Sequence, residues 1–199
     1  KINLGQTTEM TAILRDISER ARLVEELKVA ATTDPLTGIA NRRRFDELVK
    51  LEMQRCQRFG HTMSLLLIDI DHFKQINDKH GHQAGDQAIR QLARELKSWA
   101  PDQQLIGRWG GEEFLVAMTQ DGATCWRLAE QLRSRIAYLA APHMTISIGV
   151  AERSTQDDSL SQLIHRADMA MYQAKRQGRN QTVLAQSPNL SPELACNVA

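Results

Sequence analysis

The stretch RWGGEEF, residues 108–114, places two glycines directly before two glutamates and an apolar segment. Glycine reaches backbone conformations that other residues avoid, so Gly110 and Gly111 predict a tight hairpin or a close approach of the backbone to a ligand. Glu112 and Glu113 would then lie at the tip of this hairpin. Because polar hairpin tips are common at protein surfaces, this stretch alone does not indicate a site.

Apolar segments on both sides of the hairpin predict the fold. We expect strands at residues 63–71, 105–109, 112–118, 144–152 and 181–184. We expect helices capped by Asn41 and over residues 85–99, 123–139 and 159–177, with a loop rich in Gly and His between residues 71 and 85. The order β-α-β-β-α-β is that of a split βαβ sandwich. The sequence therefore predicts an α/β (α+β) fold with a mainly antiparallel central sheet and extra helices.

The N-terminal part has a different pattern. Asp16 and Glu19 have the spacing of a capping box, and Ile17, Val24 and Ala31 recur every seven residues. This pattern predicts a helix of about four turns that pairs with a partner helix. We predict four parts of the chain: the end of an upstream domain (residues 1–15), this helix (16–31), one main domain (32–184) and a disordered tail (185–199).

The composition excludes several classes of function. The net charge is +1, from 25 Lys and Arg against 24 Asp and Glu, and only 5% of residues are aromatic, so no nucleic-acid partner is expected. Three widely spaced cysteines fit reduced thiols in the cytoplasm. No apolar run approaches the ~20 residues of a membrane span. Because the first residue is Lys, we expect a piece of a longer protein, whose remainder could hold a membrane anchor.

Two acidic clusters should meet in this fold. Asp69 and Asp71 end the apolar strand 63–71, which can lie beside the hairpin that carries Glu112 and Glu113. Carboxylates gathered at one point repel each other unless a cation neutralises them, and hard oxygen ligands suit Mg²⁺ or Mn²⁺. Two such ions would organise an in-line attack on a phosphorus atom.

Cationic and amide side chains complete a candidate nucleotide site. Lys74, Lys175 and Arg179 could reach phosphate oxygens, although lysines at helix ends are more often solvated partners of the helix dipole. Asn77 and Asp86 could read a guanine edge, although such residues in Gly-containing loops more often form turns. The combination indicates a site more strongly than any single member.

Five motifs carry a family resemblance: TDPLTGIANRRRF, IDIDHFKQINDKHGHQAGD, RWGGEEF, ISIGVAE and RADMAMYQAKRQGRN. With their order and spacing, which cover residues 32–182, the chain resembles the GGDEF-domain diguanylate cyclases in their GGEEF form. The resemblance implies the fold of adenylyl cyclase catalytic domains and polymerase palms. It also implies condensation of two GTP into cyclic di-GMP and two pyrophosphates, in bacterial second-messenger signalling.

The resemblance assigns roles by position. Two metal ions per active site, Mg²⁺ or Mn²⁺, would be bound by Asp69, the carbonyl of Ile70, Glu112 and Glu113. Glu112 would also be the base for the attacking 3'-hydroxyl, and Lys74 would stabilise charge on the phosphates. Substrate GTP would be bound by Asn77, His82, Asp86, Lys175 and Arg179, with Asn77 and Asp86 selecting guanine.

The chain departs from the family pattern at two places. The inhibitory product motif RxxD is replaced by Pro101, Asp102, Gln103 and Gln104, so no inhibitory product site is expected. His72 stands where Phe or Tyr is common, with no assigned consequence. Asp71 receives no metal; it is expected to support the site or face solvent.

The stretch TAILRDISERARLVEEL resembles the end of a PAS sensor domain and its signalling helix, which implies an upstream sensor. Because each domain would hold one GTP, catalysis would need a homodimer. The main alternative is a non-catalytic, GTP-binding GGDEF-like signalling module, which the presence of Asp69, Glu112 and Glu113 disfavours. A palm-type polymerase would need a basic or aromatic track for its template, and this chain offers none. A mixed-nucleotide cyclase is disfavoured by the presence of Asp86.

Overall fold

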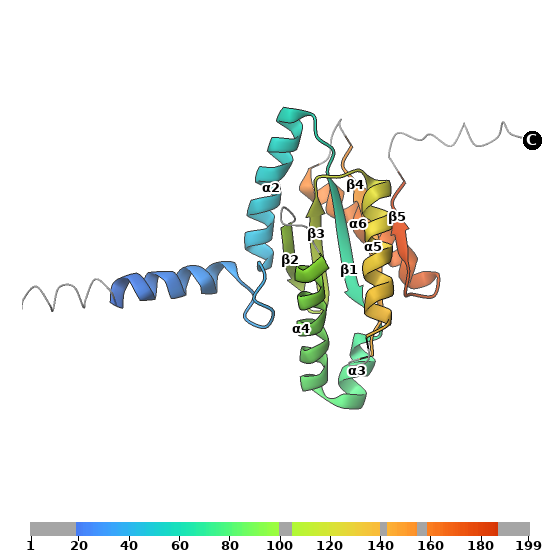
Figure 1. Cartoon of the computed structure of the whole chain (residues 1–199), viewed down its shortest axis with the longest axis horizontal. Coiled ribbons are helices and arrows are strands. Elements are labelled where there is room, and N and C mark those ends of the chain that lie inside the picture. The colour runs from blue at the N-terminus through green and yellow to red at the C-terminus, as the bar shows by residue number, and fades with distance from the viewer. Residues whose placement is uncertain (1–18, 100–104, 140–142, 155–158, 187–199) are drawn as a thin grey trace, which may run out of the picture.

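The computed structural model describes residues 19–99, 105–139, 143–154 and 159–186. Helices pack on both faces of a five-stranded sheet (Figure 1). In chain order the strands are β1 (Ser64–Ile70), β2 (Leu105–Gly110), β3 (Glu113–Met118), β4 (Ile146–Glu152) and β5 (Thr182–Leu184). Across the sheet their order is β2-β3-β1-β4-β5. The labelled helices are α2 (Arg42–Phe59), α3 (Phe73–His80), α4 (His82–Trp99), α5 (Gly122–Ala137) and α6 (Leu160–Arg176).

Strand β1 is the centre of the sheet. It pairs with β3 and β4, both antiparallel, while β2 pairs antiparallel with β3 and β5 pairs parallel with β4. The predicted split βαβ order is therefore confirmed, and the sheet is mixed rather than wholly antiparallel. All seven residues of β1 are buried, as expected of a strand covered on both faces.

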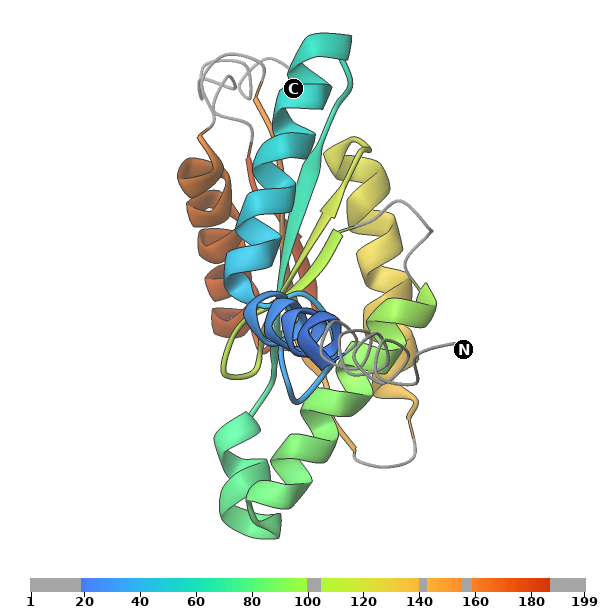
Figure 2. The same cartoon turned by 90° about the vertical axis from the view of Figure 1, so that its left-hand side faces the viewer.

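Alternate residues of β1 belong to two separate cores. Leu66 and Ile68 pack with apolar residues of α4 and α5, whereas Leu65 and Leu67 pack with those of α2 and α6. Figure 2 shows these two pairs of helices on opposite sides of the sheet. The two-residue period of a strand thus places Asp69 on the face that α6 covers.

The helix cap expected at Asn41 is present. The side chain of Asn41 accepts a hydrogen bond from the backbone N–H of Arg44 and begins α2. Ser159 and Gln162 form a reciprocal capping box at the start of α6. On α2, Phe45, Val49, Met53 and Cys56 are buried and Leu48 is half-buried.

The predicted loop between residues 71 and 85 is wrong. Residues 73–80 form helix α3, and α4 begins at His82 rather than at residue 85. Phe73 and Ile76 pack against the core, and the backbone N–H of Gly81 donates to the Asn77 carbonyl where α3 ends. A helix of eight residues is too short for its apolar periodicity to stand out among Gly and His.

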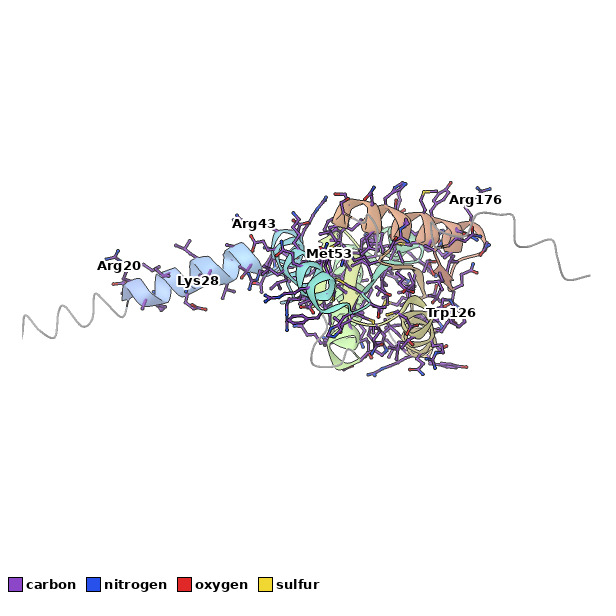
Figure 3. The ribbon with its side chains drawn as sticks, turned by 90° about the horizontal axis from the view of Figure 1, so that it is seen from above. Arg20, Lys28, Arg43, Met53, Trp126 and Arg176 are labelled. Carbon is purple, nitrogen blue, oxygen red and sulfur yellow. The ribbon has the colours of Figure 1, made fainter. Side chains whose placement is uncertain are left out.

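A helix over residues 19–32 precedes the sheet and runs away from it, as Figure 3 shows for the segment that carries Arg20 and Lys28. Its apolar side chains Leu23, Val24 and Leu27 are exposed, Leu27 to 69%. Such exposure is consistent with the predicted partner helix. The predicted upstream remnant, the RxxD window at residues 101–104 and most of the predicted tail lie outside the described residues. No helix among those described is long and apolar enough to cross a membrane.

The packing of α6 on β4 depends on Gly149. A Cβ atom at this position would lie 2.0 Å from the carbonyl oxygen of Ala167 and 2.3 Å from the backbone nitrogen of Met171. Because both atoms belong to the helix backbone, the whole of α6 would have to move away.

We therefore expect Gly149→Ala to lower the free energy of unfolding by about 1–3 kcal/mol or more, measured by urea denaturation. Gly110→Ala is the matched control, since no atom lies within 4 Å of the place that its new methyl group would take and its φ is not in the left-handed region. Equal stability of the two variants would contradict the close approach of α6 to β4.

Candidate active site

The pairing of β1 with β3 brings the two acidic clusters together. In this register Asp69 lies directly opposite Glu113, and Glu112 precedes Glu113 in the hairpin turn rather than in the strand. Asp69 is only 5% exposed, while both glutamates are half-buried. Like charges directly opposite each other on adjacent strands are destabilising, so this end of the sheet needs positive charge.

Helix α6 supplies one positive charge. The Nζ atom of Lys175 lies 2.8 Å from Oδ2 of Asp69. Buried Met171 and Ala174 fix the last turns of α6 against the sheet. The predicted phosphate-binding Lys175 therefore lies beside the predicted metal-binding Asp69, although the two are 106 positions apart in sequence (175 − 69).

The single lysine does not balance the acids. Burial raises the pKa of Asp69 from 3.8 to about 6; Lys175 lowers it, and repulsion from Glu112 and Glu113 adds to the rise. Burial also raises the pKa of Glu113, with Lys175 opposing and with Glu112 and Asp168 adding to the rise. Carboxylates in this state bind a proton or a cation more readily than solvated ones do.

The oxygen-rich cluster fits a hard divalent cation in its chemistry. Within the described ranges, no three His, Cys, Asp or Glu side chains are already arranged around a point that could hold a metal ion. Lys175 contacts Asp69 instead, as the counter-ion of this carboxylate. This contact involves only Oδ2 of Asp69.

The signature turn is held by Arg108, a residue for which the sequence predicted no role. Arg108 donates from Nε and Nη2 to the carbonyl oxygen of Gly111, at 2.9 and 2.7 Å. Its Nη1 donates to both carboxylate oxygens of Asp34, at 3.1 and 3.0 Å. Hydrogen bonds from Thr37 and Arg108 outweigh burial and lower the pKa of Asp34. Asp34 follows the 19–32 helix by two residues, so this ion pair connects that helix to the turn.

Of the two glycines in the turn, only Gly111 has a backbone conformation that favours glycine. Gly111 has φ +41°, whereas Gly110 ends β2 beside a register shift at Trp109. No atom lies within 4 Å of the position that a Cβ atom would take on either glycine, so the space next to the turn is open. The guanidinium of Arg42 stacks on the ring of Trp109, 4.0 Å from its centre.

The predicted guanine-reading residues lie on two helices rather than in a loop. Lys74 and Asn77 lie on α3, and His82 and Asp86 lie on α4. A Cβ atom on Gly85 would lie 2.1 Å from Oδ1 of Asn77, so the absence of a side chain there gives Asn77 its place beside α4. The neighbour of Gly85, Asp86, is half-buried and lies 3.9 Å from Arg90.

Asp71 and His72 lie at the end of β1. Asp71 is buried, so the solvent-facing alternative is wrong. His72 has φ +54° and precedes α3, which gives this position a conformational role: it turns the chain from the strand into the helix. Arg179, at the exposed turn after α6, also has positive φ.

Sequence comparison identifies the family of this domain. Residues 31–181 match the family model described as "Diguanylate cyclase, GGDEF domain". The chain belongs to the GGDEF family. It is 41% identical over 180 residues to the diguanylate cyclase DgcM of Escherichia coli K12, covering 88% of this chain and 44% of that protein. It is 38% identical over 195 residues to the response regulator PleD of Caulobacter vibrioides, covering 88% of this chain and 42% of PleD.

Solved GGDEF structures have the same fold. The coiled coil and GGDEF domain of DgcB from Caulobacter crescentus, in complex with c-di-GMP, superposes with a TM-score of 0.82 at 30% identity, covering 90% of this chain and 99% of that one. The active GGEEF domain of a diguanylate cyclase from Vibrio cholerae gives a TM-score of 0.71 at 34% identity, covering 74% and 97%. The predicted family and fold are confirmed. The chain spans less than half the length of DgcM and PleD, and the resemblance to a PAS domain stays a prediction.

The raised pKa of Asp69 predicts a pH dependence of stability. Between pH 3.8 and about 6 the folded GGDEF domain binds a proton that the unfolded chain has lost, so stability falls as pH rises through this window. Asp69→Asn removes that loss. From pH 3.8 to 7.5 we expect the variant to gain on the order of 2–3 kcal/mol relative to the wild type, in urea denaturation with EDTA.

Asp78→Asn is the control, because Asp78 is an exposed acid on α3. This variant should keep the pH dependence of the wild type. A wild-type slope that persists in Asp69→Asn would show that Asp69 does not take up the proton.

Proposed function

We propose that this GGDEF domain condenses two GTP molecules into cyclic di-GMP. The observation that carries the proposal is the register of β1 against β3, which sets Asp69 opposite Glu113 with Lys175 beside them. The family model and relatives such as DgcM, itself a diguanylate cyclase, support it. In each of two steps, a 3'-oxygen bonds to an α-phosphorus, the bond from this phosphorus to the bridging oxygen breaks, and pyrophosphate leaves.

The acids of the cluster would hold the metal. Asp69, the backbone carbonyl of Ile70, Glu112 and Glu113 offer hard oxygen ligands. Burial, and after it repulsion from neighbouring acids, raises the pKa of Asp69 and of Glu113, and a bound cation would stabilise the charged forms of both. When bound, two Mg²⁺ or Mn²⁺ ions would neutralise phosphate charge and polarise the attacking hydroxyl.

Glu112 would accept the proton of the attacking 3'-hydroxyl. It lies in the turn after Gly111, half-buried and next to the open space above the glycines. A ribose could thus approach it closely, which is what general-base catalysis requires. Lys74, exposed at the start of α3, would stabilise the charge that builds up on the phosphates.

The two helices after β1 would select the base. Asn77 on α3 lies against Gly85 of α4, and Asp86 is the residue that follows Gly85. An Asp can accept from the N1–H and the exocyclic amine of guanine, and an Asn amide can pair with its acceptors. His82 would line the same site, while Lys175 and Arg179 would hold the triphosphate.

A homodimer would be needed, because one domain holds one GTP and the product joins two. Each 3'-hydroxyl would attack the GTP held by the partner. The exposed apolar residues of the 19–32 helix support pairing of two chains there, and the DgcB structure includes a coiled coil. We further propose a cytoplasmic domain that an upstream sensor regulates, with no inhibition through an RxxD site.

Glu112→Gln should abolish synthesis while leaving the fold intact. With GTP and Mg²⁺, separation of the nucleotides should show cyclic di-GMP for the wild type and a loss of at least ~10²-fold for the variant, because the amide cannot accept the proton. Glu47→Gln, at an exposed acid of α2, should keep full activity. GTP binding by the wild type without turnover would favour the non-catalytic signalling module instead.

Leu27→Glu should raise the protein concentration that half-maximal activity requires. Leu27 is exposed on the 19–32 helix, and a charge there would oppose pairing that otherwise makes the encounter of two domains intramolecular. The measurement is specific activity over a dilution series, with Leu51→Glu on α2 as the matched exposed control. Identical dilution curves for both variants and the wild type would remove this role of the helix.

A further inference from the structure

The carboxylate of Asp71 joins three segments of the chain. It is buried at the end of β1, with 3% of the residue exposed. Its Oδ1 accepts from the hydroxyl of Ser147 at 2.6 Å, and its Oδ2 accepts from the hydroxyl of Thr145 at 2.7 Å. Oδ2 also accepts from the backbone N–H of Asn180 at 2.9 Å. Asp71 thus ties the end of β1 to the start of β4 and to the turn between α6 and β5.

The turn that Asp71 holds has an unfavourable backbone. Gly178, Arg179 and Asn180 have φ values of +115°, +66° and +45° in succession. Residues with a Cβ atom avoid this region, and they remain in it only where surrounding contacts hold them. Asn180 has two such contacts: its N–H donates to Asp71, and its Oδ1 accepts from Nη1 of Arg133 at 2.9 Å.

The bond from Asp71 acts on Arg179 through the backbone. The N–H of Asn180 belongs to the peptide unit that joins it to Arg179. A hydrogen bond to this N–H therefore fixes the orientation of that peptide plane, which includes the Cα atom that bears the Arg179 side chain. The side chain of Arg179 is exposed, and Arg179 N–H donates to the Ala174 carbonyl near the end of α6. Lys175, which follows Ala174, contacts Asp69.

We propose that Asp71 is a positioning residue for the triphosphate: it holds the Arg179–Asn180 peptide so that Arg179 points at the phosphates. The proposal rests on the proposed function, in which Arg179 binds GTP. A purely electrostatic role of Asp71 predicts the opposite sign, because removing a negative charge near a triphosphate would tighten its binding. The direction of the change in affinity therefore separates the two roles.

Binding of 3'-deoxy-GTP and of GMP, each with Mg²⁺, tests the proposal by calorimetry. 3'-Deoxy-GTP has no attacking hydroxyl, and GMP lacks the two outer phosphates. We expect Asp71→Ala to weaken 3'-deoxy-GTP binding roughly tenfold or more, the scale of one charge-assisted hydrogen bond, with little change for GMP. Arg179→Ala should do the same, and the double variant should bind no more weakly than Arg179→Ala alone.

Two further variants separate this role from general loss of structure. Ser147→Ala removes a buried donor to Oδ1 but leaves the bond to Asn180, so it should keep the ratio of the two affinities. Asp71→Asn retains one acceptor oxygen and should shift the ratio in the same direction as alanine, by less. It also serves if Asp71→Ala does not fold. Hydrogen exchange of residues 178–181 should rise in both Asp71 variants and not in Ser147→Ala.

Tighter binding of 3'-deoxy-GTP by the Asp71 variants, equal losses for both nucleotides, or additive losses in the double variant would each overturn the proposal. If the wild type bound neither nucleotide, the proposed function would fail and the role toward phosphate with it. Hydrogen exchange would then still show whether Asp71 holds the turn.

Discussion

The pairing of Asp69 with Glu113 across β1 and β3 is the constraint on which the site depends. It places two carboxylates side by side at a nearly buried position, with Glu112 adjacent, and a protein gains no stability from doing so. The fold responds with Lys175, which the packing of α6 delivers to Asp69. Because Asp69 is buried and one lysine faces three acids, the cluster keeps an affinity for protons and for cations, and a metal–triphosphate complex would use this affinity.

Unusual backbone conformations gather at the same end of the sheet. His72 follows β1, Gly111 precedes β3, and Arg179 and Asn180 precede β5, all with positive φ. The antiparallel and parallel pairings bring these chain positions to the same end of the sheet. Polar groups hold two of these turns, because Arg108 donates to the carbonyl of Gly111 and Asp71 accepts from the N–H of Asn180. These two hydrogen bonds thus help to hold the unusual backbone conformations at this end of the sheet.

The parts of the fold that the sequence predicted are those with a strong local signal. The apolar run of β1, the Asn41 cap and the glycines of the hairpin each depend on neighbours within a few residues. Helix α3 was not predicted because eight residues with two apolar contacts show too little periodicity. The role of Arg108 was not predicted for another reason. The role of Arg108 depends on a partner 74 positions earlier in the chain, Asp34, whose Oδ2 lies 3.0 Å from Nη1 of Arg108 only in the folded protein.

The sequence by itself determined the family, the order of the strands and of the helices other than α3, and the types of side chain available for metal, phosphate and base. These follow from residue identity and spacing along the chain. Only the tertiary structure decided that Asp69 faces Glu113 and contacts Lys175, that Gly85 gives Asn77 its place beside α4, and that Asp71 is buried under the turn of Arg179. Each of these depends on strand register or on the close packing of helices, and such distances between remote residues are set by the packed core as a whole rather than by any local stretch.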